Sequence, residues 1–354
     1  MSQIAPAVSV IIPILNEVRT IDATLESVVC QSYPELEILV VDGVSDDGTL
    51  AKLLAWSAQD PRVRVLTNHR KSIPTGLNLG LREATGSYLV RVDAHCTIPN
   101  DYVERLVTHL QTGKWAGVGG KKEAVGSPPS GAAIAASLGS PFGVGGSAYH
   151  YATEPMETDH IPFGAYGTDL ARELGGWDER LVANEDYEFD VRVRASGGKL
   201  LLDPTIEVAW RCRSRIIDLA RQYRRYGRGK ADVAFLHPSE VRFRHAAPPL
   251  VVAALVVCAG LLPFFPLLLP GVLLVYLALL IGMSAPIMRT LGSWRDRFRV
   301  PGVLGAMQLA WGWGVWEGLA RIARYGFRLP EASGVDSTRW GSPEWAVEDE
   351  PPIT

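Results

Sequence analysis

The chain has 354 residues, of which 47% are hydrophobic, and its formal net charge at pH 7 is −3. This length suffices for two or more domains, since ordinary domains hold about 100–200 residues. The small negative charge argues against a protein that binds nucleic acid through overall basicity. Four cysteines without paired spacing exclude a disulfide framework and a structural zinc site, and they favour a reducing compartment.

The first 110 residues alternate between strand and helix patterns. The predicted strands are 8–15, 36–43, 62–66 and 88–93, and the predicted helices are 19–31, 75–84 and a segment that ends at 59 and is capped by Asp46 or Asp47. Repeated βα units predict an α/β fold with a mostly parallel sheet, in which ligands bind at the carboxyl ends of the strands. Asn16, Asp42 and Asp93 each lie at such an end, so we interpret them as parts of one site.

The fourth strand ends in an Asp-Ala-His sequence. Asp93 and His95 are two residues apart, so in an extended chain their side chains point the same way. A carboxylate and an imidazole so placed can hold a divalent cation, and Mn²⁺ accepts imidazole more readily than Mg²⁺ does. The simpler alternative is a capping aspartate and a solvated histidine, because a three-residue pattern recurs by chance.

The middle of the chain holds a small-residue stretch and an acidic cluster. Residues 126–147 are rich in Gly, Ser, Ala and Pro, which predicts a long mobile loop over the site. After a predicted turn at Gly175-Gly176, four carboxylates mark the start of a helix predicted at 185–195, namely Glu185, Asp186, Glu188 and Asp190. They either favour the helix dipole or include a general base.

The last third of the chain predicts a membrane region. Residues 248–288 carry no charged side chain, which is long enough for a hairpin of two crossings, and prolines occupy its centre. Arginines precede and follow this stretch, which places both of its ends on the cytoplasmic side of the plasma (inner) membrane. Residues 300–323 predict either a third crossing or a helix in the membrane interface. The acidic, Pro-rich tail at 326–354 predicts disorder.

A basic segment, RQYRRYGRGK at 221–230, precedes the hairpin. Next to a bilayer such a segment binds lipid headgroups, or its arginines and aromatic rings clamp a diphosphate and a sugar.

Five blocks of the sequence together resemble the family 2 glycosyltransferases, which have the GT-A fold. They are VSVIIPILNE, SYPELEILVVDGVSDDGT, TGLNLGLREATGSYLVRVDAHC, GGWDERLVANEDYEFD and QYRRYG, and they cover about the first 245 residues. Within the family, VRVDAHC, SPFGVGGSAY and PFGAY are most similar to membrane-anchored enzymes of the ExoA type of succinoglycan biosynthesis. The resemblance implies a catalytic domain at 1–245 and a membrane region at 246–325, followed by the acidic tail at 326–354.

The resemblance also implies roles for individual residues. The residues it assigns to the donor nucleotide are Pro13, Asn16, Glu17, Asp42, Asn78 and Asp93. Asp93 matches the first aspartate of the family's D-x-D metal motif, and His95 stands where the last aspartate usually is, so the cofactor is Mn²⁺ or Mg²⁺. Asp186 matches the catalytic base, with Glu185 beside it. Gln222, Arg225 and Tyr226 resemble a Q-x-x-R-W motif that contacts diphosphate and acceptor, with Tyr in place of Trp, which disfavours a processive synthase.

These roles imply an inverting glycosyltransferase that moves a sugar, with UDP-glucose favoured, to a hydroxyl of a polyprenyl-diphosphate-linked glycan in exopolysaccharide or cell-envelope synthesis. One alternative is a polyprenyl-phosphate sugar synthase. A second is a catalytically inactive, membrane-anchored nucleotide-binding or scaffold protein. A dehydrogenase is excluded, because no G-x-G-x-x-G turn follows the first strand. The expected partners are the nucleotide sugar, the lipid-linked acceptor and the bilayer, with no nucleic acid.

Overall fold

The computed structural model describes residues 6–242 and 245–327, which form two compact units. The first unit holds the described residues up to 123 and residues 152–210, and the second holds residues 124–151 and the described residues between 211 and 327. The boundary at residue 245 between a catalytic domain and a membrane region stays a prediction. The predicted tail falls, from residue 328 onward, outside the described residues.

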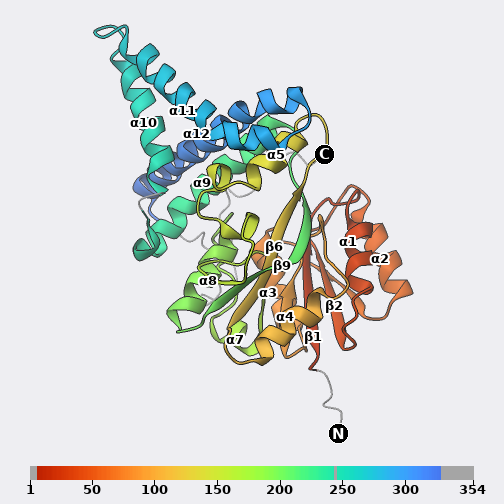
Figure 1. Cartoon of the computed structure of the whole chain (residues 1–354). Coiled ribbons are helices and arrows are strands. Elements are labelled where there is room, and N and C mark those ends of the chain that lie inside the picture. The colour runs from red at the N-terminus through yellow and green to blue at the C-terminus, as the bar shows by residue number, and fades with distance from the viewer. Residues whose placement is uncertain (1–5, 243–244, 328–354) are drawn as a thin grey trace. The chain divides into compact units, whose positions relative to one another are not determined.

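The strands are β1 (Val8–Ile14), β2 (Leu36–Asp42), β3 (Val63–Thr67), β4 (Tyr88–Arg91), β5 (Cys96–Thr97), β6 (Gly117–Val125), β7 (Met156–Thr158), β8 (Ala165–Gly167) and β9 (Leu200–Arg211). They lie in the order β3-β2-β1-β4-β8-β6-β9-β5, with β7 beside β9 (Figure 1). The neighbours from β3 to β4 pair in parallel, whereas β8 pairs antiparallel with both β4 and β6. The predicted α/β class with a parallel central sheet is confirmed, and antiparallel strands extend it beyond β4.

The register aligns the carboxyl ends of the parallel strands. Ile14 lies opposite Asp42, and Asp42 lies opposite Thr67. Arg91, the last residue of β4, lies opposite Ile11 in β1, so Asp93 follows at the same edge of the sheet. The apolar runs explain this arrangement, because a strand that is covered on both faces must be hydrophobic along its whole length.

The helices of the first unit are α1 (Ile21–Val29), α2 (Thr49–Gln59), α3 (Ile73–Glu83), α4 (Tyr102–Gln111), α7 (Thr168–Glu173) and α8 (Glu185–Ala195). Helix α8 has the predicted bounds, and α3 begins two residues earlier than predicted, because the Ser72 side chain caps it. Gly80 lets α3 lie directly on β1, since a Cβ there would come within 2.5 Å of the Ile11 side chain. The core under the site therefore joins α3, β1 and α8 in one hydrophobic cluster that includes Leu77 and Phe189.

The second unit contains α5 (Gly131–Leu138), α6 (Pro141–Val144), a 3₁₀ turn at Ala148–His150, α9 (Ile216–Leu236), a 3₁₀ turn at Pro238–Glu240, α10 (Ala247–Gly260), α11 (Leu268–Thr290) and α12 (Trp294–Tyr325). The prediction of a long loop at 126–147 was wrong, because α5 and α6 occupy this segment. Small residues suit loops, but here Ala133, Ile134 and Leu138 are buried and stabilise a helix.

The predicted hairpin corresponds to α10 and α11, and α12 contains the whole of the uncertain segment 300–323. Among the described residues, α11 is the one helix that is both long and apolar enough to cross a membrane, and α10 has 14 residues. A membrane-associated hairpin therefore agrees with the structure by composition, whereas the number of crossings does not follow from it.

Candidate active site

The predicted nucleotide residues at the ends of β1 and β2 shape one loop. The Asn16 Oδ1 atom accepts a hydrogen bond from the backbone of Asp46 at 3.0 Å, and the backbone of Asn16 donates to Ser45 at 2.9 Å. Asp42, which is buried, accepts from the backbone N–H of Ser45 at 3.1 Å. Asn16 has a φ of 56°, in the left-handed region that asparagine tolerates better than most residues. Pro13, in β1, is half-buried beside this loop.

A buried arginine joins the end of β4 to the acidic cluster. Arg91 donates to Asp93 at 2.9 Å and to Glu185 at 3.0 Å, and its side chain is 7% exposed. Burial opposes ionisation of Asp93, but Arg91 and His95 hold the pKa of this carboxyl below its usual value. Burial and the neighbouring Asp186 raise the pKa of Glu185, although Arg91 opposes this. The predicted metal motif and the predicted base motif therefore meet at the guanidinium group of Arg91.

His95 lies beside a second predicted residue. Its Nδ1 atom is 3.2 Å from the Oε1 atom of Glu17, and its ring is tilted against that of Trp210. Within the described residues, no three His, Cys, Asp or Glu side chains gather as a metal cluster. The role of Asp93 and His95 as metal ligands stays a prediction. If these two side chains held a cation, its other positions would fall to substrate oxygens and water.

Asp186 stands next to a buried histidine that the sequence did not point to. Its Oδ2 atom is 3.8 Å from the Nε2 atom of His160, and its side chain is 33% exposed. The Nδ1 atom of His160 lies 2.7 Å from Asp190, which is fully buried. Asp190 also accepts from the backbone of Ile161 at 2.9 Å and from the Tyr166 hydroxyl at 2.7 Å. Asp190 therefore orients the imidazole toward Asp186.

Electrostatics favour a charged imidazole at this position. Burial alone would lower the pKa of His160, but Asp186, Asp190 and Asp159 together raise it above its ordinary value. Burial raises the pKa of Asp190, although its bond to His160 opposes this change. Asp186, the candidate base, thus lies beside the imidazole of His160, while its own carboxylate remains accessible to solvent.

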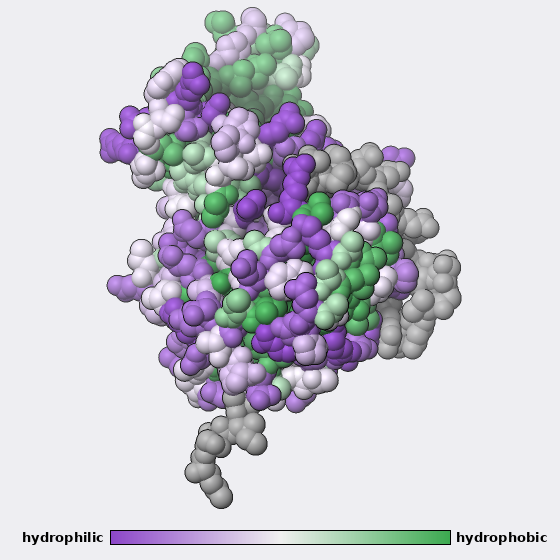
Figure 2. Space-filling view, turned by 90° about the vertical axis from the view of Figure 1, so that its right-hand side faces the viewer, coloured by the Kyte–Doolittle hydropathy of each residue, from purple (hydrophilic) through white to green (hydrophobic). Residues whose placement is uncertain are grey.

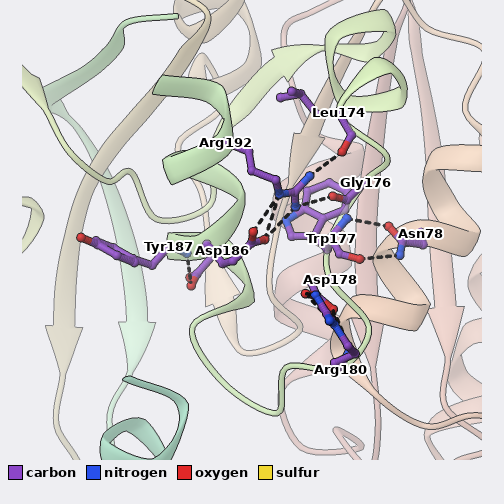
Figure 3. A network of polar contacts seen from close by, with 10 residues as sticks. Asn78, Leu174, Gly176, Trp177, Asp178, Arg180, Asp186, Tyr187 and Arg192 are labelled. Carbon is purple, nitrogen blue, oxygen red and sulfur yellow. Dashed lines mark hydrogen bonds and ion pairs between the residues drawn. The ribbon is translucent and has the colours of Figure 1, made fainter. Parts of the chain in front are cut away.

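The side chain of Asn78 is bound to the loop before α8. Its side-chain oxygen accepts from the backbone of Trp177 at 2.8 Å, and its nitrogen donates to the Trp177 carbonyl at 2.8 Å and to Glu179 at 2.9 Å (Figure 3). Gly176, with a φ of 72°, comes so close that any Cβ there would collide with the amide. Both ends of this amide hold the loop before α8, so Asn78 positions that loop. Its predicted contact with the nucleotide stays a prediction.

The same loop is tied to α8 by an arginine. Arg192 donates to Glu188 at 2.7 Å. It also donates to the carbonyl oxygens of Leu174 and Gly176, as Figure 3 shows. These bonds fix the first turns of α8, from which Asp186 projects, against the loop that Asn78 holds. The backbone N–H of Tyr187 donates to Asp186 at 2.7 Å and further restricts the base candidate.

Lys122, in β6, is a further cation near these carboxylates. Its ammonium lies 3.9 Å from the centre of the Trp210 ring and 4.8 Å from that of Phe163. Burial lowers the pKa of Lys122, and Asp93 and Asp186 partly oppose this change. Aromatic faces attract a cation, so this pair of rings accommodates the ammonium in the interior.

The basic segment belongs to the second unit. Gln222 is buried in α9 and donates to the Tyr226 hydroxyl at 2.9 Å, one helical turn away. Arg225 lies on the same helix between them. Contact of these three residues with diphosphate or acceptor stays a prediction.

Sequence reasoning missed Arg91, His160 and Lys122. Arg91 had a local signal, since it is a charged residue at the end of an apolar strand, and Lys122 is the second of two lysines that follow the buried start of β6. His160 had no such signal, because its partner Asp190 lies 30 residues further along the chain.

Comparisons with known proteins agree with this geometry. The family model described as "Glycosyl transferase family 2" matches residues 9–132. The chain is 28% identical over 329 residues to the succinoglycan biosynthesis protein ExoA of Rhizobium meliloti, covering 89% of this chain and 96% of that protein. It is 30% identical over 233 residues to a dolichyl N-acetyl-α-D-glucosaminyl phosphate 3-β-D-2,3-diacetamido-2,3-dideoxy-β-D-glucuronosyltransferase of Methanococcus voltae, covering 63% of this chain and 72% of that protein.

A solved structure shares the fold. The mannosyltransferase PcManGT from Pyrobaculum calidifontis, in complex with GDP-Man and Mn²⁺, superimposes with a TM-score of 0.56 at 20% identity. The match covers 89% of this chain and 87% of that one. Together with the matched family model and the extent of the relatives' similarity, it shows that this chain belongs to the family 2 glycosyltransferases, is of the ExoA type and has the GT-A fold.

Proposed function

We propose that this glycosyltransferase moves a sugar, by a single inverting displacement, from a nucleotide-diphosphate donor to a hydroxyl of a polyprenyl-diphosphate-linked glycan. The product would serve exopolysaccharide or cell-envelope synthesis. The observation that carries the proposal is the convergence of Asp93 and Glu185 on Arg91, with the solvent-accessible Asp186 next to it in the chain. UDP-glucose is the donor that the likeness to ExoA favours.

The strand-end loop would bind the donor. Pro13, Asn16, Glu17 and Asp42 would hold the nucleoside, and Asn78 would lie in the nucleotide pocket. Asp93 and His95 would hold Mn²⁺ or Mg²⁺ against the diphosphate, and the Mn²⁺ in the PcManGT complex supports such a cation. When bound, the cation would stabilise the negative charge that develops on the leaving diphosphate.

Asp186 would act as the general base. Its carboxylate takes the proton of the acceptor hydroxyl while that oxygen forms a bond to the anomeric carbon, and the bond from this carbon to the diphosphate oxygen breaks on the opposite face. Glu185, bound to Arg91, would keep the start of α8 in place. Gln222, Arg225 and Tyr226 would contact the diphosphate or the acceptor. The name of the Methanococcus relative, a transferase to a sugar already carried on a dolichyl phosphate, supports a hydroxyl acceptor.

The bilayer would hold the enzyme near its lipid-borne acceptor. The apolar hairpin of α10 and α11 supports attachment to the plasma membrane, and the arginines around it support a cytoplasmic catalytic domain.

Nucleotide binding tests the donor site. We expect purified full-length protein to bind UDP more tightly with Mn²⁺ than without, and Asp93→Asn to lose the metal-dependent part. Asparagine is preferable to alanine, because its oxygen can still accept the bond from Arg91. Asp101→Asn, at an exposed helix start, is the matched control and should bind normally. Calorimetry with UDP, GDP and dTDP makes the measurement, and absence of binding to every nucleotide would contradict the proposal.

Removal of His160 tests its role in positioning and charge. We expect the wild-type rate to fall as the pH rises through the raised pKa of His160, because the imidazole then loses the charge that lies beside Asp186. His160→Gln should lack this part of the pH–rate profile and turn over more slowly at neutral pH. The loss of rate should be smaller than that of Asp186→Asn. His109→Gln, which removes a histidine paired with Asp203 at 3.0 Å on α4, should leave the profile unchanged. Identical profiles for both variants would show that His160 is only structural.

A further inference from the structure

The C-terminal part of helix α12, residues 311–321, lies against residues 224–232 of α9. A Cβ on Gly227 would collide with the carbonyl of Trp311, and a Cβ on Gly314 would collide with that of Arg224. A Cβ on Gly318 would come within 2.6 Å of the Ala231 side chain. Glycines at these three points allow the two helices to approach closely, so this part of α12 occupies the same depth as α9 relative to any membrane.

Ion pairs reinforce this contact. Arg224 donates to both oxygens of Glu317, at 2.6 and 2.8 Å, and Arg321 pairs with Asp232. Near the other end of α12, Arg299 donates to the carbonyl of Pro129, which precedes α5. The uncharged centre of α12, residues 300–316, is therefore held between polar attachments at both ends.

Helix α9 cannot lie in hydrocarbon. It carries five cationic side chains between residues 221 and 230, namely Arg221, Arg224, Arg225, Arg228 and Lys230. Each arginine or lysine at the centre of a bilayer costs about 2.5–3.5 kcal/mol, so placing five there would cost on the order of 10 kcal/mol or more. Residues 311–321 of α12 share the depth of α9, so they lie outside the hydrocarbon as well. The uncharged residues that remain, 300–310, span about 16 Å at 1.5 Å per residue, which is too short to cross a hydrocarbon core of about 30 Å.

The hairpin starts from the level of α12 and extends only a short distance beyond it. The Tyr276 hydroxyl in α11 bonds to Gln308 of α12 at 3.3 Å, and the Trp316 indole donates to the carbonyl of Pro249 in α10 at 2.8 Å. From Tyr276 to the start of the turn at Leu267, α11 spans about 14 Å at 1.5 Å per residue. The hydrocarbon core of a bilayer is about 30 Å thick, so this length reaches about its middle.

The part beyond α12 is apolar and uncovered. Leu267 is 82% exposed, Phe264 75% and Leu274 68%. Figure 2 shows the hydrophobic residues of this hairpin gathered at the top of the view, farthest from the viewer. Trp294 and Trp313 are exposed on α12, and tryptophan is enriched at the boundary between lipid and water. The exposed surface thus changes from aromatic and charged on α12 to purely apolar at the tip of the hairpin.

We propose that α10 and α11 form a re-entrant hairpin that enters one leaflet of a phospholipid bilayer and returns to the same side, with α12 lying in the interface. No described segment between residues 245 and 327 then crosses the membrane. This inference rests on the membrane attachment in the proposed function, and it replaces the two crossings expected from the length of the uncharged stretch.

Cysteine accessibility distinguishes the two topologies. Leu267→Cys at the tip and Gly292→Cys at the base, between α11 and α12, are expressed in a bacterial host in the full-length Cys30→Ser background. We expect a membrane-impermeant maleimide to label Gly292→Cys in inverted vesicles only. Leu267→Cys should react at least about tenfold more slowly from either side, because it lies in hydrocarbon, and it should label fully once detergent is added.

Fast labelling of Leu267→Cys in spheroplasts would overturn the proposal in favour of two crossings. Fast labelling of Leu267→Cys in inverted vesicles would overturn the proposal in favour of a hairpin that lies in water. Release of the protein from membranes by alkaline carbonate would do the same. Quenching of a fluorophore on Leu267→Cys provides a second measurement, and spin labels deep in the acyl chains should quench it more strongly than labels at the headgroup. These measurements use no sugar donor, so their failure is distinguishable from a failure of the proposed transferase reaction, which activity assays report.

Discussion

Replacement of Arg91 by methionine is expected to lower the free energy of unfolding by about 3–5 kcal/mol, the usual cost of removing one partner from a buried charged group. The side chain is 7% exposed and holds Asp93 and Glu185 at 2.9 and 3.0 Å. Without it, two carboxylates lie close together with Asp186 beside them and lack their shared cation. Urea denaturation of the full-length protein in detergent, followed by tryptophan fluorescence, measures the change.

Arg64→Met is the matched control for this prediction. Arg64 lies in β3 of the same sheet and pairs with Glu37 and Glu83, but its side chain is 43% exposed. Exposed ion pairs contribute about 0–1 kcal/mol, so the control should unfold close to the wild-type midpoint. Equal destabilisation by the two substitutions would contradict a special role for the buried arginine.

Replacement of Asp186 by asparagine is expected to lower turnover by about 10²–10⁴-fold, the usual contribution of a general base. Asparagine keeps the size of the side chain and an oxygen that can accept from the backbone of Tyr187, so donor binding should be retained. Initial rates of sugar transfer and calorimetric nucleotide affinities, measured on the same preparation, separate the two effects.

Asp169→Asn, on α7 with a side chain that is 93% exposed, is the control for the general base and should leave turnover unchanged. A parallel loss of nucleotide affinity in Asp186→Asn would assign Asp186 to donor binding instead. Unchanged turnover would remove it from the mechanism.

The parts of the fold that were predictable depend on local pattern. The apolar runs of β1 and β2 have the lengths of buried strands, and the acidic start of α8 favours a helix at the position where it forms. Because parallel strands end at one edge, the positions of Asn16, Asp42 and Asp93 followed from the chain order.

The parts that were not predictable depend on contacts between distant residues. Arg91 and Glu185 are separated by 94 positions, and His160 and Asp190 by 30, so no local pattern connects them. The amide of Asn78 likewise bonds to Trp177, which lies about 100 residues further along the chain. Helix α5 was missed for a related reason, because tertiary burial of Ala133 and Ile134 outweighs a composition typical of loops.

Membrane topology illustrates the limit of composition as a guide. The length of the uncharged stretch 248–288 allowed two crossings, and the segment 300–323 allowed a third. The glycines that bring the C-terminal part of α12 onto the basic helix α9 contain the additional information, because they fix the depth of that part.

The most direct test of the central claim is sugar transfer itself. Membranes that contain the wild-type protein or Asp186→Asn are incubated with Mn²⁺ and radiolabelled UDP-glucose, UDP-galactose or GDP-mannose, and label is counted in extracted lipid-linked glycans. The account predicts label from one of these donors with the wild-type protein, and little or none with Asp186→Asn. Absence of transfer from every donor, or equal transfer by both proteins, would contradict it.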